Sequence, residues 1–188
     1  MERNEKVGVD LGLTKEEKKI LLSIARTTIV SKARGQSLPE VTPATPTLNE
    51  NRGAFVSLHR HGNLRGCIGY IQAVKPLYQT IQEMALSAAF RDPRFPPLEE
   101  KDLADLDIEI SVLTPMREVS DITEIEIGRD GLMIIKEPHS GLLLPQVATE
   151  YGWDRETFLS QTCIKAGLPV DAWKDTNTTV LAFSADVF

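Results

Sequence analysis

A hairpin pattern followed by a helical pattern occurs twice in this chain, and this order restricts the fold more than any other feature. Side chains that alternate between apolar and polar, bounded by turn residues, are typical of paired strands. The four strand-like runs cover residues 54–59, 64–70, 131–136 and 141–145. The two copies share few residues, but the matched order favours an internal duplication of a hairpin-helix unit. We therefore predict a mixed, mainly antiparallel sheet with helices packed on it.

Helices are expected after each hairpin and near the N-terminus. Pro76 can open the helix after the first hairpin, which must end near Asp92 because Pro93 follows. Asp154 is a suitable N-cap for the helix after the second. The residues from Thr14 to Glu17 have the form of a capping box. Strands are predicted over residues 106–113 and, as a central strand, 178–183.

Three prolines lie between the first helix and the first hairpin. Pro39, Pro43 and Pro46 exclude a regular helix over residues 37–48. We expect this segment to be an extended arm that wraps over the surface, not a linker between domains.

Composition indicates a single domain over residues 1–188, which has room for two subdomains in one cooperative unit. The chain is 41% hydrophobic and 26% charged, which is ordinary for a globular protein. Its net charge of -6 argues against a surface that neutralises nucleic acid. Without a signal-peptide pattern or an apolar run that could cross a bilayer, we expect a cytoplasmic protein with no membrane partner. Two cysteines far apart fit reduced thiols.

The string Leu64-Arg65-Gly66-Cys67-Ile68-Gly69 is the strongest candidate for a functional site. On a strand, Arg65 and Cys67 point to the same face, so a thiol shares a surface with a positive charge. Gly66 and Gly69 reduce the bulk near the sulfur and allow a ligand or another backbone to come close.

Cys67 has two interpretations. As a nucleophile it would have its pKa lowered by Arg65 from about 8.5, with His59 on the partner strand as a weak candidate for the base. As a structural residue it would be a small side chain at a tight position in the sheet, and the residues alone favour this second interpretation. Cys163, on an apolar helical stripe, should be inert.

The loop that follows the helix after the first hairpin also has two interpretations. Arg91 and Arg94, on a loop stiffened by prolines, would bind a carboxylate or phosphate. Equally, Asp92 would pair with an arginine and cap the turn. Gln146 is a candidate polar contact at the same ligand site. Neither cysteine nor histidine occurs with zinc spacing, and the sequence identifies no metal site and no cofactor.

Several of these strings occur together and in the order found in one known family. They are Leu64 to Gly69, Asp92-Pro93-Arg94-Phe95-Pro96-Pro97, Leu144-Pro145-Gln146-Val147-Ala148, Gly152-Trp153-Asp154 and Lys165-Ala166-Gly167. From about residue 13 to 188 the chain resembles the AMMECR family, whose bacterial and archaeal branch is called AmmeMemoRadiSam system protein A. The resemblance implies an α+β fold in which a larger and a smaller part enclose a cleft that receives the Arg-Gly-Cys-Ile-Gly motif.

The resemblance brings no established activity, so two functional hypotheses follow. One is an enzyme or enzyme subunit that holds a small anion by Arg65, Arg91 and Arg94, with Cys67 at the reacting end, and acts with Memo-like and radical SAM proteins in a modification pathway. The other is a binding or adaptor module for a peptide or nucleotide. A regulator associated with nucleic acid is disfavoured by the acidic charge.

Overall fold

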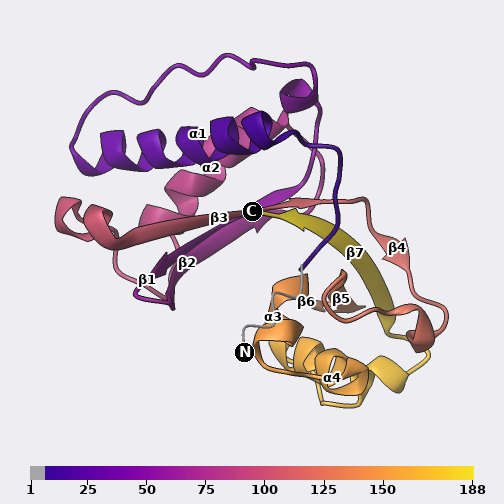
Figure 1. Cartoon of the computed structure of the whole chain (residues 1–188). Coiled ribbons are helices and arrows are strands. Elements are labelled where there is room, and N and C mark those ends of the chain that lie inside the picture. The colour runs from indigo at the N-terminus through magenta and orange to yellow at the C-terminus, as the bar shows by residue number, and fades with distance from the viewer. Residues whose placement is uncertain (1–6) are drawn as a thin grey trace, which may run out of the picture. The chain divides into compact units, whose positions relative to one another are not determined.

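The computed structural model describes residues 7–188 and shows a mixture of helices and antiparallel strands, which confirms the predicted fold class (Figure 1). The chain divides into two compact units. One comprises Leu11–Leu113 and the last three residues, Asp186–Phe188. The other comprises Thr114–Ala185 together with the segment that ends at Asp10. The predicted cleft between a larger and a smaller part stays a prediction.

The unit formed mainly by Leu11–Leu113 is a three-stranded sheet covered by two helices on one face. Its elements are α1 (Lys15–Ala33), β1 (Ala54–Arg60), β2 (Asn63–Tyr70), α2 (Leu77–Phe90) and β3 (Leu106–Leu113), with short 3-10 turns at Thr47–Asn49 and Glu100–Asp105. β1 lies in the middle and pairs antiparallel with both β2 and β3. Alternate residues of β1, such as Val56 and Leu58, are fully buried in one core with Ile81 and Ala85 of α2.

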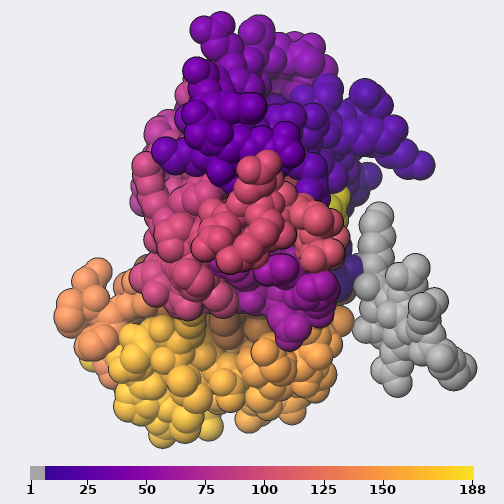
Figure 2. All heavy atoms as spheres, turned by 90° about the vertical axis from the view of Figure 1, so that its left-hand side faces the viewer, coloured from indigo at the N-terminus to yellow at the C-terminus, as the bar shows by residue number. Residues whose placement is uncertain are grey.

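The N-terminal helix and the arm are held together by Glu17. Thr14 caps α1 by accepting the Glu17 N–H, and the Glu17 carboxylate accepts from the Thr14 N–H, so the predicted capping box is present. The same carboxylate accepts a hydrogen bond of 2.6 Å from Thr45 of the arm. The arm itself runs as an extended segment at the surface, violet in Figure 2, as its prolines predicted.

The unit formed mainly by Thr114–Ala185 also has a hairpin followed by helices. Its elements are β4 (Arg117–Glu118), β5 (Asp130–Lys136), β6 (His139–Leu143), α3 (Pro145–Glu150), α4 (Arg155–Lys165) and β7 (Thr179–Val187), whose end reaches the other unit, with 3-10 turns at Ile122–Glu124 and Ala172–Lys174. β7 lies between β5 and the short β4, so its prediction as a central strand is confirmed. The hairpin turn is shorter than predicted, because β6 begins at His139.

The two units have the same connectivity. In each, the first hairpin strand is in the middle, and the strand after the helix pairs antiparallel with it. In each, a glycine of the second hairpin strand lies against the backbone at the C-terminal end of a later helix, α2 in one unit and α4 in the other. A Cβ on Gly66 would collide with the carbonyl of Ala88 in α2, and one on Gly141 would collide with the backbone of Ala166 at the end of α4. The repeated connectivity supports the predicted duplication.

No helix in residues 7–188 is long and apolar enough to cross a membrane.

Candidate functional site

Cys67 lies in the middle of β2, on the strand's polar face. Its partner across the strand pair is Ser57 of β1. The Ser57 hydroxyl donates a hydrogen bond of 3.1 Å to the Cys67 sulfur. Val56 and Leu58, the neighbours of Ser57, point to the opposite, helix-covered face and are fully buried. The hairpin register therefore places a hydroxyl directly beside the thiol.

The side chains of Asp92 and Arg94 hold the main chain of Cys67 from the outer edge of β2. One Asp92 oxygen accepts the Cys67 N–H at 2.9 Å, and Arg94 Nη2 donates to the Cys67 carbonyl at 3.2 Å. Arg94 also donates twice to Asp92, from Nε at 2.9 Å and from Nη2 at 2.7 Å. The pair thus satisfies both main-chain groups of an edge residue, as a neighbouring strand would.

Asp92 is the buried centre of this arrangement. Its side chain is 1% exposed, whereas that of Arg94 is 44% exposed. The hydrogen bonds from Arg94 are the main reason why the pKa of Asp92 falls to about 2. Asp92 also accepts the Arg94 N–H, and its carbonyl accepts the Phe95 N–H, so it caps the turn. Of the two interpretations of this loop, the structure supports the internal network.

Arg65 anchors the other end of the same loop. Its Nη2 donates to the carbonyl of Pro96 at 2.7 Å, while its Nη1 is buried without a hydrogen-bond partner in the described part of the chain. The Phe95 ring lies near two guanidinium groups, 5.8 Å from that of Arg65 and 5.4 Å from that of Arg94. Residues 92–97, which we call the anchored loop, are therefore fixed at both ends along β2.

The thiol of Cys67 is less acidic than an ordinary cysteine, contrary to the expectation that Arg65 would lower its pKa. Burial raises the pKa, and the charges of Asp92 and Glu109 raise it further. The Ser57 hydrogen bond and the Arg94 charge act in the opposite direction but do not outweigh burial. Arg94 is the cation whose charge lowers the pKa of the thiol, while the Arg65 guanidinium donates to the Pro96 carbonyl.

His59, the weak candidate for a base, is on β1, two residues after the Ser57 that pairs with Cys67. It pairs with Leu64, beyond a shift in strand register between Leu58 and His59. No hydrogen bond joins His59 to Cys67 in the described residues. Its catalytic role stays a prediction, as does that of Cys67.

The two glycines of the motif make room for the protein's own groups. Gly66 faces Ala88 of α2, away from the face that carries the thiol, and Gly69 lies under the ring of Phe55, its partner on β1. Of the two alternatives predicted for these glycines, Gly66 shows the close approach of another backbone, and ligand binding at Gly66 and Gly69 stays a prediction.

Arg91 and Gln146 do not take part in the hydrogen bonds that hold the anchored loop in the described residues. Arg91 is exposed at the end of α2, and its charge contributes to lowering the pKa of Glu83. Within residues 7–188, no ion pair joins Arg91 to Asp92. Gln146 is buried in α3, which belongs to the other unit. Its grouping with the other candidates stays a prediction.

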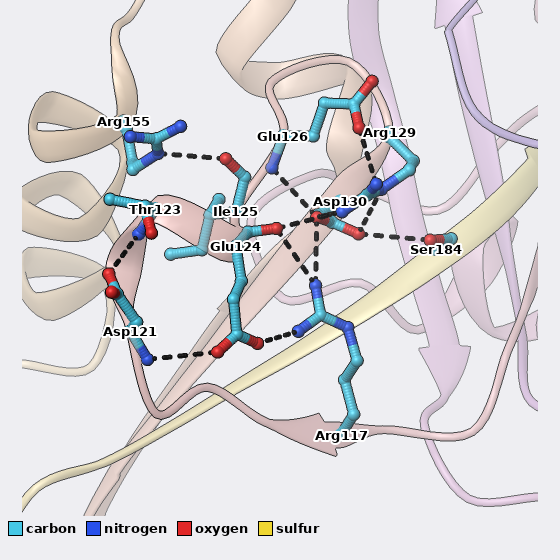
Figure 3. A network of polar contacts seen from close by, with 10 residues as sticks. All are labelled: Arg117, Asp121, Thr123, Glu124, Ile125, Glu126, Arg129, Asp130, Arg155 and Ser184. Atoms are coloured by element: carbon cyan, nitrogen blue, oxygen red, sulfur yellow. Dashed lines mark hydrogen bonds and ion pairs between the residues drawn. The ribbon is translucent and has the colours of Figure 1, made fainter.

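Sequence reasoning missed a second buried carboxylate, Asp130, at the start of β5 (Figure 3). Its side chain is 1% exposed and accepts hydrogen bonds from two guanidinium groups. Arg129 donates at 2.6 Å and Arg117 of β4 at 3.3 Å. The Glu126 N–H and the Ser184 hydroxyl also donate to it, at 2.9 and 3.2 Å.

The contacts of Asp130 make it a structural centre. They connect β4, β5, β7 and the turn before β5 in one hydrogen-bond network. Arg117 and Arg129 donate their hydrogen bonds to carboxylates and carbonyls of the same unit. Arg129 and Asp130 are neighbours in the sequence, but an Arg-Asp pair of this kind is equally compatible with a structural role and with ligand binding. In residues 7–188, no three His, Cys, Asp or Glu side chains come together in a way that could hold a metal ion.

Comparison with known proteins places the chain among archaeal relatives. The family model AMMECR1 matches residues 22–188. A protein from Methanothermobacter thermautotrophicus is 47% identical over 185 residues, covering 94% of this chain and 95% of its own. Protein TK0174 from Thermococcus kodakarensis is 46% identical over 179 residues, covering 89% of this chain and 87% of its own. The crystal structure of the uncharacterized protein PH0010 from Pyrococcus horikoshii has a TM-score of 0.89 and 39% identity, covering 93% of this chain and 92% of its own.

Proposed function

The chain belongs to the AMMECR1 family, and we propose that it is a cytoplasmic binding subunit whose recognition element is the anchored loop on β2. The proposed partners are proteins, namely the Memo-like and radical SAM proteins that the family association suggests. The observation that carries the proposal is the attachment of Asp92 and Arg94 to the main chain of Cys67.

The anchored loop combines exposure with rigidity. Pro93, Pro96 and Pro97 are exposed, yet both ends of the loop are fixed by hydrogen bonds to β2 or to Arg65. A rigid surface loses little conformational entropy when a partner binds. Arginine and aromatic side chains are enriched in protein interfaces, and the loop presents Arg94 beside Phe95.

The same contacts disfavour a thiol nucleophile. A nucleophilic cysteine requires a thiolate, but burial raises the pKa of Cys67. It also requires a base within hydrogen-bond reach, and the residue that meets the sulfur is Ser57, a hydroxyl. Arg94, which was expected to clamp an anion, is already paired with Asp92.

Association with the purified partner proteins tests the proposal. Pro97→Glu adds a charge to the anchored loop while leaving the Pro96 carbonyl in place, and we expect it to weaken binding about tenfold by isothermal titration. Pro169→Glu is the matched control, because Pro169 is an exposed proline in the other unit. Equal affinities for both variants, at equal melting temperatures, would rule out the loop as the recognition element.

An enzyme subunit with Cys67 as the reacting thiol is the second candidate. The Ser57 hydrogen bond and the Arg94 charge favour it, because both lower the pKa of the thiol. Its test is the activity of the reconstituted Memo-like and radical SAM system with Cys67→Ser. A loss of turnover with unchanged association would support catalysis over binding.

A further inference from the structure

A groove on the outer side of α2 has the features of a small-molecule site and lies away from Cys67. Its volume is about 330 Å³, within the range of ligand pockets. One wall is the arm, through Leu38 and Val41, and the other is α2, through Tyr78 and Leu86. The opposite side of α2, where Ala88 meets Gly66, packs on the sheet.

The walls of the groove are held in place without a ligand. Gln82 of α2 donates a hydrogen bond of 2.8 Å to the carbonyl of Pro39 in the arm. The far end of the arm is tied to α1 by the bond from Thr45 to Glu17 and by Leu48, which is fully buried. A preformed groove avoids the cost of ordering its walls when a ligand binds.

The groove ends at an ion pair with surplus donors. Both oxygens of Glu83 accept hydrogen bonds, one from the Tyr70 hydroxyl at 2.7 Å and the other from Lys75. These bonds lower the pKa of Glu83, and the bond to Glu83 raises that of Lys75, so both are charged at neutral pH. The Lys75 side chain is 41% exposed, and an ammonium has three N–H donors.

The charge balance at this end favours an anionic group. The negative charge of Glu83 is opposed by Lys75 and by Arg91, whose charge also lowers the pKa of Glu83. A ligand carboxylate can accept a hydrogen bond from the Lys75 ammonium, and Glu83 still accepts the hydrogen bond from the Tyr70 hydroxyl. An ammonium ligand would meet Lys75 directly. Beyond this end, Leu38, Val41 and Leu86 offer apolar contacts to a hydrocarbon body, beside the polar Gln79 and Gln82.

We propose that the groove between the arm and α2 binds a small amphiphilic carboxylate, with its apolar body between Leu38 and Leu86 and its carboxylate at Lys75. This site is independent of the proposed partner surface on the anchored loop, because none of its lining residues contacts residues 92–97 through a hydrogen bond or ion pair in the described chain.

Hexanoate is a suitable probe, followed by chemical-shift titration of the isotope-labelled full chain. A ligand of this size should bind with a dissociation constant on the order of 1 mM. We expect shifts confined to the arm and α2, and an affinity about twofold to threefold lower for each methylene removed on going to butanoate. Hexylammonium, which has the opposite charge, should bind more weakly than hexanoate.

Two variants locate the site, and a third is the control. Lys75→Met keeps an apolar stem and should weaken hexanoate binding about threefold to fivefold. Leu38→Ser changes an exposed side chain, so the fold is retained while binding weakens about threefold. Lys101→Met removes another surface lysine paired with a glutamate, outside the groove, and should have no effect. Binding that is absent, insensitive to both groove variants, or equally strong for hexylammonium would overturn the proposal.

Discussion

The buried carboxylate of Asp92 accepts a hydrogen bond of 2.9 Å from the main-chain N–H of Cys67, which is twenty-five residues earlier in the chain. The thiol is therefore positioned by a loop that reaches around the edge of β2. The same carboxylate forms an ion pair with Arg94. In one interpretation of the sequence, Arg94 binds an anionic ligand, but in the structure the Asp92–Arg94 pair attaches this loop to β2.

Removing Asp92 should destabilise the protein more than removing Arg94. Asp92→Ala leaves a buried N–H and a guanidinium without their acceptor, which we expect to lower the free energy of unfolding by about 2–3 kcal/mol. Arg94→Ala, at a half-exposed side chain, should cost about 1 kcal/mol. Urea denaturation measures both, with Lys101→Ala, at an exposed ion pair, as the control. A larger loss of unfolding free energy for Arg94→Ala than for Asp92→Ala would contradict the central position of the Asp92 carboxylate.

Arg94 should not govern anion binding. Because its Nε and Nη2 bind Asp92, Arg94→Lys is expected to lower the melting temperature without changing the affinity for sulfate, measured by calorimetric titration. A loss of sulfate binding at an unchanged melting temperature would restore the anion-clamp interpretation.

Acid should release the arm from α1. Hydrogen bonds from Thr45 and Thr14 lower the pKa of Glu17 from 4.5 to about 2. The resulting stabilisation is complete above pH 4.5 and is lost as the pH falls towards 2, because the unfolded state then binds the proton first. Glu17→Gln should lose about 1–2 kcal/mol at pH 7 and show a flatter acid profile. Unfolding curves between pH 2 and 7 measure this difference, and parallel profiles would contradict it.

The two cysteines should differ in alkylation rate through access. Cys67 is half-buried and Cys163 fully buried, and burial raises the pKa of both thiols. Iodoacetamide should therefore modify Cys67 first, but more slowly than an unfolded cysteine at pH 7. Mass spectrometry of timed samples gives both rates. Reaction of Cys67 faster than the unfolded reference would show an activated thiol.

Alanine at either interface glycine should be poorly tolerated. Gly66→Ala and Gly141→Ala place a Cβ into main-chain atoms at the C-terminal ends of α2 and α4, respectively, which cannot turn aside as a flexible side chain can. We expect each to lower the free energy of unfolding by about 2–3 kcal/mol. Ser140→Ala, at an exposed position of β6, is the control and should change little. Similar stability for all three variants would mean that the helices are less closely packed than described.

Local patterns were sufficient for most of the fold. The capping box at Thr14, the prolines Pro76 and Pro93 on either side of α2 and the strand pattern over residues 106–113 are short-range signals, and each predicted its element. The repeated order of hairpin, helix and strand also predicted that the two units share their connectivity. The second hairpin turn was predicted too long, because the second strand was expected to begin at Gly141, whereas β6 begins at His139. Hairpin turns that differ by one or two residues have similar sequence patterns.

The residues of β2 could be recognised from local pattern alone, and with them the shared face of Arg65 and Cys67, because alternation is a property of any strand. What these two side chains contact depends on how distant segments pack. Burial and not a neighbouring charge controls the pKa of Cys67, Arg65 turns to the Pro96 carbonyl, and Asp92 takes up Arg94. Desolvation and ion pairing depend on which segments lie together in the fold, and the loop after α2 lies along β2 because α2 packs on that sheet.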